Sequence, residues 1–163
     1  MTINTAPWNR IVSQVQIDAS VDEVWAYVRD IATHVEWMAD AESITFTTPE
    51  THGVGAAFDC VTKIGPITLI DKMRVDSWDD GWAIGVSHHG LVTGVGEFKL
   101  AHDGSGTTTF TWTEALKFPW WLAGQLGFVV GGRWVLQAVW RRNLGRLRDH
   151  FDSVTNGRDE TAS

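Results

Sequence analysis

Residues 119–151 read PWWLAGQLGFVVGGRWVLQAVWRRNLGRLRDHF, and the other segments of the sequence are best understood in relation to this stretch. It opens with a proline and ends among arginines, which suits a helix start and the negative end of a helix dipole. Its apolar residues recur every three or four positions, so they share one helical face. We therefore predict a long amphipathic helix whose inner face is formed by Val129, Arg133, Leu136, Trp140, Leu144, Leu147 and Phe151.

The residues before this helix predict the sheet on which it lies. Residues 10–18 alternate between apolar and polar side chains, as a half-buried strand does. Ser20 with Glu23 forms a capping box that begins a short helix, and Thr33 with Glu36 forms a second box that begins another. Further strands are expected at residues 43–48, 56–64, 67–77, 82–87, 95–102 and 107–116, with tight turns between them. This order predicts an α+β fold with an antiparallel sheet of about seven strands.

Length, charge and cysteine content limit the class of protein. A chain of 163 residues is typical of one domain, here residues 1–152, and residues 153–163 carry no periodicity and are expected to be disordered. The net charge of -7 disfavours nucleic acid as a partner, because phosphate binding needs clustered Lys and Arg. The single Cys60 excludes an internal disulfide and fits a reducing, cytoplasmic compartment. Residues 120–140 contain Arg133 and several glycines, so we expect no integral membrane segment.

Strand alternation predicts which side chains face the space between the sheet and the long helix. Within the strand at 67–77, Asp71 shares the parity of the apolar residue Met73. Within the strand at 107–116, Glu114 has the same parity as Trp112. The candidate catalytic residues are Asp71, Glu114 and His88, and the candidate ligand-binding residues are Arg133, Trp112, Phe110, Phe58, Met73, Val129, Leu136 and Trp140.

Two carboxylates and a guanidinium in an apolar space are costly unless they are paired. One interpretation is an internal ion pair of Arg133 with Glu114 or Asp71 that orients the helix. A second is a polar anchor for a ligand carboxylate, phenol or carbonyl, and a third is a carboxylate of raised pKa that acts as a general base. A register slip of one residue on either strand removes that carboxylate from the cavity, so the sequence leaves all three interpretations open.

Histidine and glycine patterns in the sequence give no sign of a metal or a cofactor. His88 and His89 are neighbours on a strand and so face opposite ways, and the remaining histidines do not have the helical spacing of metal ligands. Residues 53–55 and 94–96 both read GVG but lack the third glycine of a dinucleotide-binding loop. We interpret both as bends or loop ends, and we expect no metal and no cofactor.

Four stretches carry a resemblance to a known superfamily. They are VSQVQIDASVDEVWAYVRDIATHVEWM at 12–38, GPITLIDKMRVDSWDDGWAIGV at 65–86, GVGEFKL at 94–100 and GTTTFTWTEAL at 106–116. In them the sequence resembles the START-like helix-grip (SRPBCC) superfamily, in particular its polyketide cyclase/dehydrase and lipid-transport branch. The resemblance covers nearly the whole chain and rests on packing patterns. It implies a curved antiparallel sheet that grips the last helix, with an apolar cavity between them for a lipid, polyketide, hormone or similar small molecule.

Three functions are consistent with the sequence. The first is a binding or transport protein, monomeric or homodimeric, for a polyketide-like, aromatic or lipid-like ligand. The second is a cyclase/dehydratase in which the cavity carboxylates, Arg133 or His88 assist enolisation and loss of water, with catalysis depending mainly on shape and orientation. The third is an interaction module that docks a membrane or a partner through Trp120 and Trp121, which requires both rings to be exposed.

Overall fold

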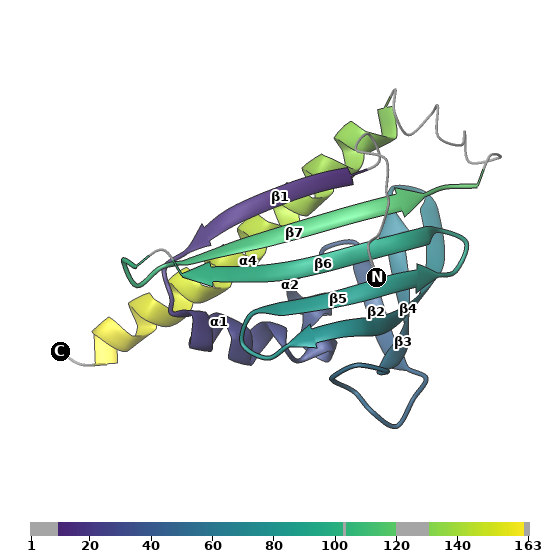
Figure 1. Cartoon of the computed structure of the whole chain (residues 1–163). Coiled ribbons are helices and arrows are strands. Elements are labelled where there is room, and N and C mark those ends of the chain that lie inside the picture. The colour runs from purple at the N-terminus through teal and green to yellow at the C-terminus, as the bar shows by residue number, and fades with distance from the viewer. Residues whose placement is uncertain (1–9, 103, 120–130, 162–163) are drawn as a thin grey trace.

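The computed structural model describes residues 10–102, 104–119 and 131–161, which form one curved sheet, two short helices and one long helix (Figure 1). The sheet has seven antiparallel strands in the order β1-β7-β6-β5-β4-β3-β2. Helices α1 (Val21–Val28) and α2 (His34–Trp37), with the 3₁₀ turn η2 (Ile31–Thr33) between them, connect β1 to β2. The strands are β1 (Arg10–Ile17), β2 (Ala41–Phe46), β3 (Ala57–Ile64), β4 (Ile67–Asp79), β5 (Ala83–His89), β6 (Thr93–His102) and β7 (Thr108–Lys117). The predicted α+β class and order of elements are confirmed.

The sheet is strongly curved around the long helix. Figure 1 shows β2, β3 and β4 turning away from the plane of β1, β7, β6 and β5. Helix α4 (Arg133–Thr161) packs against β1 and α2. Because a straight helix cannot follow a curved sheet along its whole length, space remains between them unless large side chains fill it. This is the arrangement that the helix-grip resemblance implies.

The two predicted capping boxes have different outcomes. At α1 the Ser20 hydroxyl accepts from the Glu23 backbone N–H at 3.3 Å, and Glu23 accepts from the Ser20 backbone N–H at 3.1 Å, so this box is confirmed. The box predicted at Thr33 is wrong, because Thr33 makes no side-chain cap. Its backbone already has helical dihedral angles as the last residue of η2, whereas a capping residue is usually extended. Its hydroxyl donates instead to the carbonyl of Asp30 at 2.8 Å.

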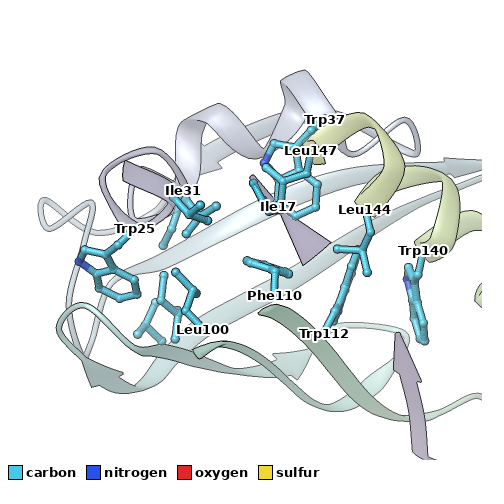
Figure 2. Packing of buried hydrophobic residues seen from close by; sticks show 14 of the residues in the cluster. Ile17, Trp25, Ile31, Trp37, Leu100, Phe110, Trp112, Trp140, Leu144 and Leu147 are labelled. Carbon is cyan, nitrogen blue, oxygen red and sulfur yellow. The ribbon is translucent and has the colours of Figure 1, made fainter. Parts of the chain in front are cut away.

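The main core lies between α4, the short helices and the inner face of the sheet (Figure 2). Leu144 and Leu147 are fully buried on α4 at the predicted helical spacing. Trp37 of α2 is buried as well, and its ring lies 6.2 Å from that of Phe110 on β7. Burial of side chains of this size contributes roughly 1.5–3 kcal/mol each. This core fixes α4 relative to the sheet.

One polar residue also ties α4 to the chain before β2. Asn143 is completely buried, and its Oδ1 accepts from the backbone N–H of Ala39 at 2.9 Å. Its Nδ2 donates to Asp40 Oδ1 at 2.6 Å. Both ends of the amide are therefore satisfied, as burial of a polar group requires.

The predicted helix can be compared with α4 only from residue 131 onward. The described part of α4 begins at Arg133, and residues 120–130 of the predicted helix, which include Val129, Trp120 and Trp121, lie outside the described residues. At the other end α4 continues to Thr161, whereas the sequence predicts a disordered tail from residue 153. Residues 152–154 are exposed, so there is no apolar periodicity after Phe151 by which the continuation could be recognised. None of the described helices is long and apolar enough to cross a membrane.

Candidate functional site

A cavity of about 140 Å³ lies between the inner face of the sheet and the first described turns of α4. Its wall is mainly apolar, but Asp71, His88 and Glu114 interrupt it in one place. The volume is close to that of an engineered apolar cavity, about 150 Å³, that stays dry and binds benzene. Ile70 and Leu91 belong to the wall and are 57% and 41% exposed, so the cavity reaches the surface beside them. There is room inside for about one ring, with an exit for a longer molecule.

Asp71, His88 and Glu114 form one polar group in the wall, which we call the acidic–histidine cluster. His88 Nδ1 lies 2.7 Å from Asp71 Oδ2. On the other side of the ring, His88 Nε2 lies 3.9 Å from Glu114 Oε1. The same Glu114 oxygen accepts a hydrogen bond from Trp112 Nε1 at 2.9 Å. The imidazole is thus held between two carboxyl groups, one of which is fixed by an indole N–H from its own strand.

The cluster draws its residues from three strands, with Asp71 on β4, His88 on β5 and Glu114 on β7. Strand β6 lies between β5 and β7, and its residue Gly96 is paired with Glu114 on one side and Val86 on the other. A Cβ at Gly96 would lie 3.1 Å from Glu114 Oε1 and 3.4 Å from His88 Nε2. The missing side chain at Gly96 therefore lets His88 and Glu114 approach each other across β6.

The prediction that residues 94–96 form a bend or loop end is wrong. Gly94 and Gly96 lie within β6, and Gly94 has a φ of 149°. A Cβ at Gly94 would collide with the carbonyl oxygen of Ala115. Glycine inside a strand often marks a close approach, and this is the sequence signal that could have located the centre of the cluster. The other GVG, residues 53–55, does lie in the loop between β2 and β3, as predicted.

The surroundings of the cluster change the protonation of its members. Burial raises the pKa of Glu114 to about 7, although the charge of His88 and the hydrogen bond from Trp112 oppose this shift. Burial by itself lowers the pKa of His88, but the hydrogen bond to Asp71 and the charges of Glu114 and Asp71 outweigh burial and raise it. The cluster therefore favours the protonated form of the imidazole, and near neutral pH it contains a carboxyl group that is part protonated. Such a pair can both donate and accept protons.

Two polar atoms of the cluster are buried without a hydrogen-bond partner among the described residues. They are His88 Nε2 and Asp71 Oδ1. His88 is only 5% exposed and lines the cavity, so the partner of its free nitrogen must come from the contents of the cavity. Leaving one such atom unpaired costs about 1–3 kcal/mol. A polar group of a bound molecule would remove this cost.

His34 and Cys60 also line the cavity but are less suited to chemistry. His34 Nε2 lies 2.8 Å from the carbonyl oxygen of Val28, and burial lowers the pKa of His34 to about 4, so the ring is neutral. Burial raises the pKa of Cys60 to about 11. A protonated thiol is a poor nucleophile, so Cys60 acts as part of the apolar wall.

The structure brings all three candidate catalytic residues together, and neither carboxylate has left the cavity through a register slip. Most of the candidate ligand-binding residues also line the cavity, namely Phe58, Met73, Trp112, Leu136 and Trp140. Phe110 does not belong to the described wall. It is fully buried in the core, with its ring 5.2 Å from that of Phe98. Val129 lies outside the described residues.

Arg133 occupies a different place from the one expected. It is exposed at the first residue of α4 and is not part of the described cavity wall. The neighbouring Trp134 is 70% exposed and Val135 is 52% exposed, so burial on α4 begins only at Leu136. Among the described side chains the cavity carboxylates interact with His88 instead. Of the three interpretations, the ion pair of Arg133 with Glu114 or Asp71 is not found among the described residues.

The two adjacent histidines face opposite sides of the sheet, as strand alternation predicts. His88 is buried in the cluster, whereas His89 is exposed and its Nε2 lies 2.7 Å from Ser87 Oγ. Within the part of the chain that the structure describes, no group of three His, Cys, Asp or Glu side chains is arranged to hold a metal ion.

Comparison with known proteins identifies a family for this fold. Residues 9–152 match the family described as polyketide cyclase / dehydrase and lipid transport. No curated protein matches the sequence significantly.

Several solved structures share the fold at low sequence identity. The Zhui aromatase/cyclase from Streptomyces sp. R1128 is 17% identical with a TM-score of 0.65, over 94% of this chain and 95% of that chain. A hypothetical protein from Helicobacter pylori is 11% identical with a TM-score of 0.71, over 91% and 90% of the two chains. A protein from Nitrosospira multiformis is 17% identical with a TM-score of 0.66, over 90% and 99%. At these identities the likeness shows the fold alone. Because the family match spans nearly the whole sequence, the chain belongs to the polyketide cyclase/dehydrase and lipid transport family, within the START-like (SRPBCC) helix-grip superfamily.

Proposed function

We propose that the protein binds a hydrophobic small molecule of polyketide-like, aromatic or lipid-like character in the cavity between the sheet and α4. The observation that carries this proposal is a mainly apolar cavity with an acidic–histidine cluster in its wall, in which His88 Nε2 and Asp71 Oδ1 are buried without partners. A cavity with no ligand would be better stabilised by apolar residues alone. A molecule with a hydrocarbon body and a polar group satisfies both the wall and the cluster.

The proposal is tested by native mass spectrometry of the protein purified from its natural host, with solvent extraction of any retained molecule. We expect a bound molecule with a defined mass and an apolar skeleton. A variant that fills the cavity, Leu136→Trp, should lose it, because Leu136 lines the cavity and is half-buried. The matched control is Val135→Trp, since Val135 is the next residue but is exposed. Retention of the same molecule by Leu136→Trp would show that this cavity is not the binding site.

A second function, a cyclase/dehydratase type of enzyme, is favoured by one observation. Glu114 has a pKa of about 7 and lies beside the His88 imidazole in the cavity wall. An ionised Glu114 can take a proton from a carbon next to a substrate carbonyl. His88 Nε2–H can then protonate the hydroxyl on the β-carbon, which leaves as water while the C–O bond breaks and a C=C bond forms. Asp71 orients the imidazole and stabilises its charge through Nδ1.

This second function is tested with an aromatic β-hydroxy thioester as a surrogate substrate, following loss of water by mass spectrometry and by the absorbance of the conjugated product. If the protein is such an enzyme, Glu114→Gln should lower the rate by at least about 100-fold, the lower limit for loss of a general acid or base. Asp76→Asn serves as the control, because Asp76 is exposed on the same strand as Asp71 but is not part of the cavity wall. If the surrogate binds but no water is lost, the enzyme function is contradicted and only the carrier function remains.

A further inference from the structure

We propose that the ligand's polar group is an uncharged hydroxyl, enol or carbonyl group rather than a carboxylate, and that the acidic–histidine cluster selects against anionic ligands. This inference rests on the proposed binding function and states the chemical class of the ligand. It separates fatty acids and other organic acids from phenols, enols and ketones as occupants of the cavity.

The charge of the cavity wall disfavours an anionic ligand. Three acidic side chains line the cavity, namely Asp71, Glu114 and Asp40, and Asp40 accepts from Asn143. Glu97 also borders the cavity, but it is exposed and follows the inward Gly96 on β6. No Lys or Arg belongs to the described part of the wall. Residues 120–130, which precede α4, contain no charged residue in the sequence either. A ligand carboxylate in this cavity would therefore meet several like charges, and like charges are costly at short range in an apolar medium.

Among the described residues of the wall, His88 is the one cationic group that faces the cavity, and its charge is already matched. His88 already has Asp71 Oδ2 at 2.7 Å on one side and Glu114 Oε1 at 3.9 Å on the other. Its charge is therefore matched by protein carboxylates before any ligand arrives. An anion placed against His88 Nε2 would also stand close to Glu114, which His88 approaches from the same nitrogen. The imidazole can donate one hydrogen bond to a ligand but offers little net attraction to a negative charge.

The two buried atoms of the cluster that lack hydrogen-bond partners among the described residues, His88 Nε2 and Asp71 Oδ1, favour an uncharged polar group. A protonated His88 Nε2 is a donor, and Asp71 Oδ1 is an acceptor. Because Asp71 binds the ring through Nδ1, the two atoms lie on opposite sides of the imidazole. A ligand hydroxyl or carbonyl that accepts from His88 Nε2 satisfies the first, and a second hydroxyl of the same molecule that donates to Asp71 Oδ1 satisfies the other. A ligand ammonium group would satisfy only Asp71 and would place its charge near that of His88. An uncharged polar group therefore fits the cluster better than either ion.

The experiment compares four ligands that share a propylbenzene skeleton, sized for a cavity that holds about one ring. They are propylbenzene, 4-propylphenol, 4-propylbenzoate and 4-propylbenzylamine, with binding measured at about pH 7.5 by calorimetry and by shifts of the tryptophan indole N–H resonances. Trp112 and Trp140 line the cavity and so report occupancy. We expect 4-propylphenol, which is uncharged at this pH, to bind at least about 10-fold more tightly than 4-propylbenzoate.

The double variant Asp71→Asn/Glu114→Gln tests whether the cluster causes this preference. It replaces both carboxyl groups of the cluster with amides of similar shape, so the advantage of the phenol over the benzoate should fall to about two-fold or less. Asp76→Asn/Asp79→Asn is the matched control, because both residues are exposed on β4 and neither lines the cavity. This control variant also replaces two carboxyl groups with amides, and it should keep the full preference for the phenol over the benzoate.

The outcomes distinguish this inference from the proposed function. If propylbenzene and the phenol bind but the benzoate or the amine binds as tightly as the phenol, the inference is overturned and the binding function stands. An unchanged preference in the double cluster variant also overturns it. If none of the four compounds binds, including propylbenzene, the proposed binding function itself fails together with the inference.

Discussion

Glu114 is a buried carboxyl group that the fold makes harder to ionise. Its pKa rises from 4.5 to about 7, mainly through burial. The folded state therefore holds this proton more tightly than the unfolded state does. The associated stability is fully present below the ordinary pKa and is lost as the pH rises through about 7. The raised pKa of His88 acts in the same direction, because its contribution is likewise lost as the pH rises.

This sign leads to a prediction about the Glu114→Gln variant. Between about pH 5 and about pH 8, Glu114 should cost the wild-type protein roughly 2–3 kcal/mol of unfolding free energy. The unfolding free energy of the variant should fall by roughly 2–3 kcal/mol less over the same pH interval, because an amide does not ionise. Urea unfolding at the two pH values measures both changes, with Asp76→Asn as a control that removes an exposed carboxylate. Equal pH dependence in wild type and Glu114→Gln would mean that this carboxyl ionises at its ordinary pKa.

At the scale of elements, Asn143 holds helix α4 against the residues that lead into β2. Its amide satisfies the Ala39 N–H and Asp40 Oδ1 inside the protein. Asn143→Ala leaves a buried N–H without a partner and creates a small cavity, so we expect the unfolding free energy to fall by about 2–4 kcal/mol. Chemical denaturation measures this loss. A change below about 0.5 kcal/mol, the usual limit for surface positions, would show that the contact is not important for stability.

Two glycines should respond in opposite ways to the same substitution. Gly145 lies inside α4, and a Cβ there would meet nothing within 4 Å. Gly145→Ala should therefore stabilise the protein by about 0.5–1 kcal/mol, the difference in helix propensity. Gly96→Ala should instead destabilise it by roughly 1–3 kcal/mol, because the new methyl group crowds Glu114 and His88. Thermal unfolding of the two variants checks both signs, and stabilisation by Gly96→Ala would contradict the close approach across β6.

At the scale of the whole molecule, α4 belongs to two regions with different tasks. Its residues Leu144 and Leu147 are part of the core, whereas Leu136 lines the cavity. Leu136 and Leu147 are separated by about 16 Å along the helix at 1.5 Å per residue. The core therefore fixes the helix while the earlier turns border the ligand.

This separation predicts that stability and binding can be changed independently. Leu147→Ala should lower the unfolding free energy by about 2–5 kcal/mol and change the affinity for 4-propylphenol by less than about two-fold. Leu136→Trp should lower that affinity by at least about 10-fold, because the large indole occupies the cavity. Denaturation curves and calorimetry on both variants provide the comparison. Loss of affinity in Leu147→Ala at a temperature where it stays folded would show that the two regions are coupled.

The order of the elements and most of the inward-facing residues follow from local patterns in the sequence. Alternation in β4 and β7 placed Asp71 and Glu114 on the inner face, and helical spacing placed Leu136, Trp140 and Leu144 on the inner stripe of α4. These features depend on local periodicity, which a single strand or helix carries in its own residues. For the same reason the family could be recognised from its packing patterns.

Which of the inward residues meet depends on how the strands are arranged in the folded chain. His88 and Glu114 come together because β6 lies between their strands and has Gly96 at that position, and the residues that meet this way are far apart in the sequence. Arg133 shares the helical periodicity of the buried stripe, but it is the first residue of α4 and is exposed. Periodicity fixes the face of an element. Strand order, register and the extent of the opposing surface fix the neighbours of each residue, and these are long-range properties of the folded chain.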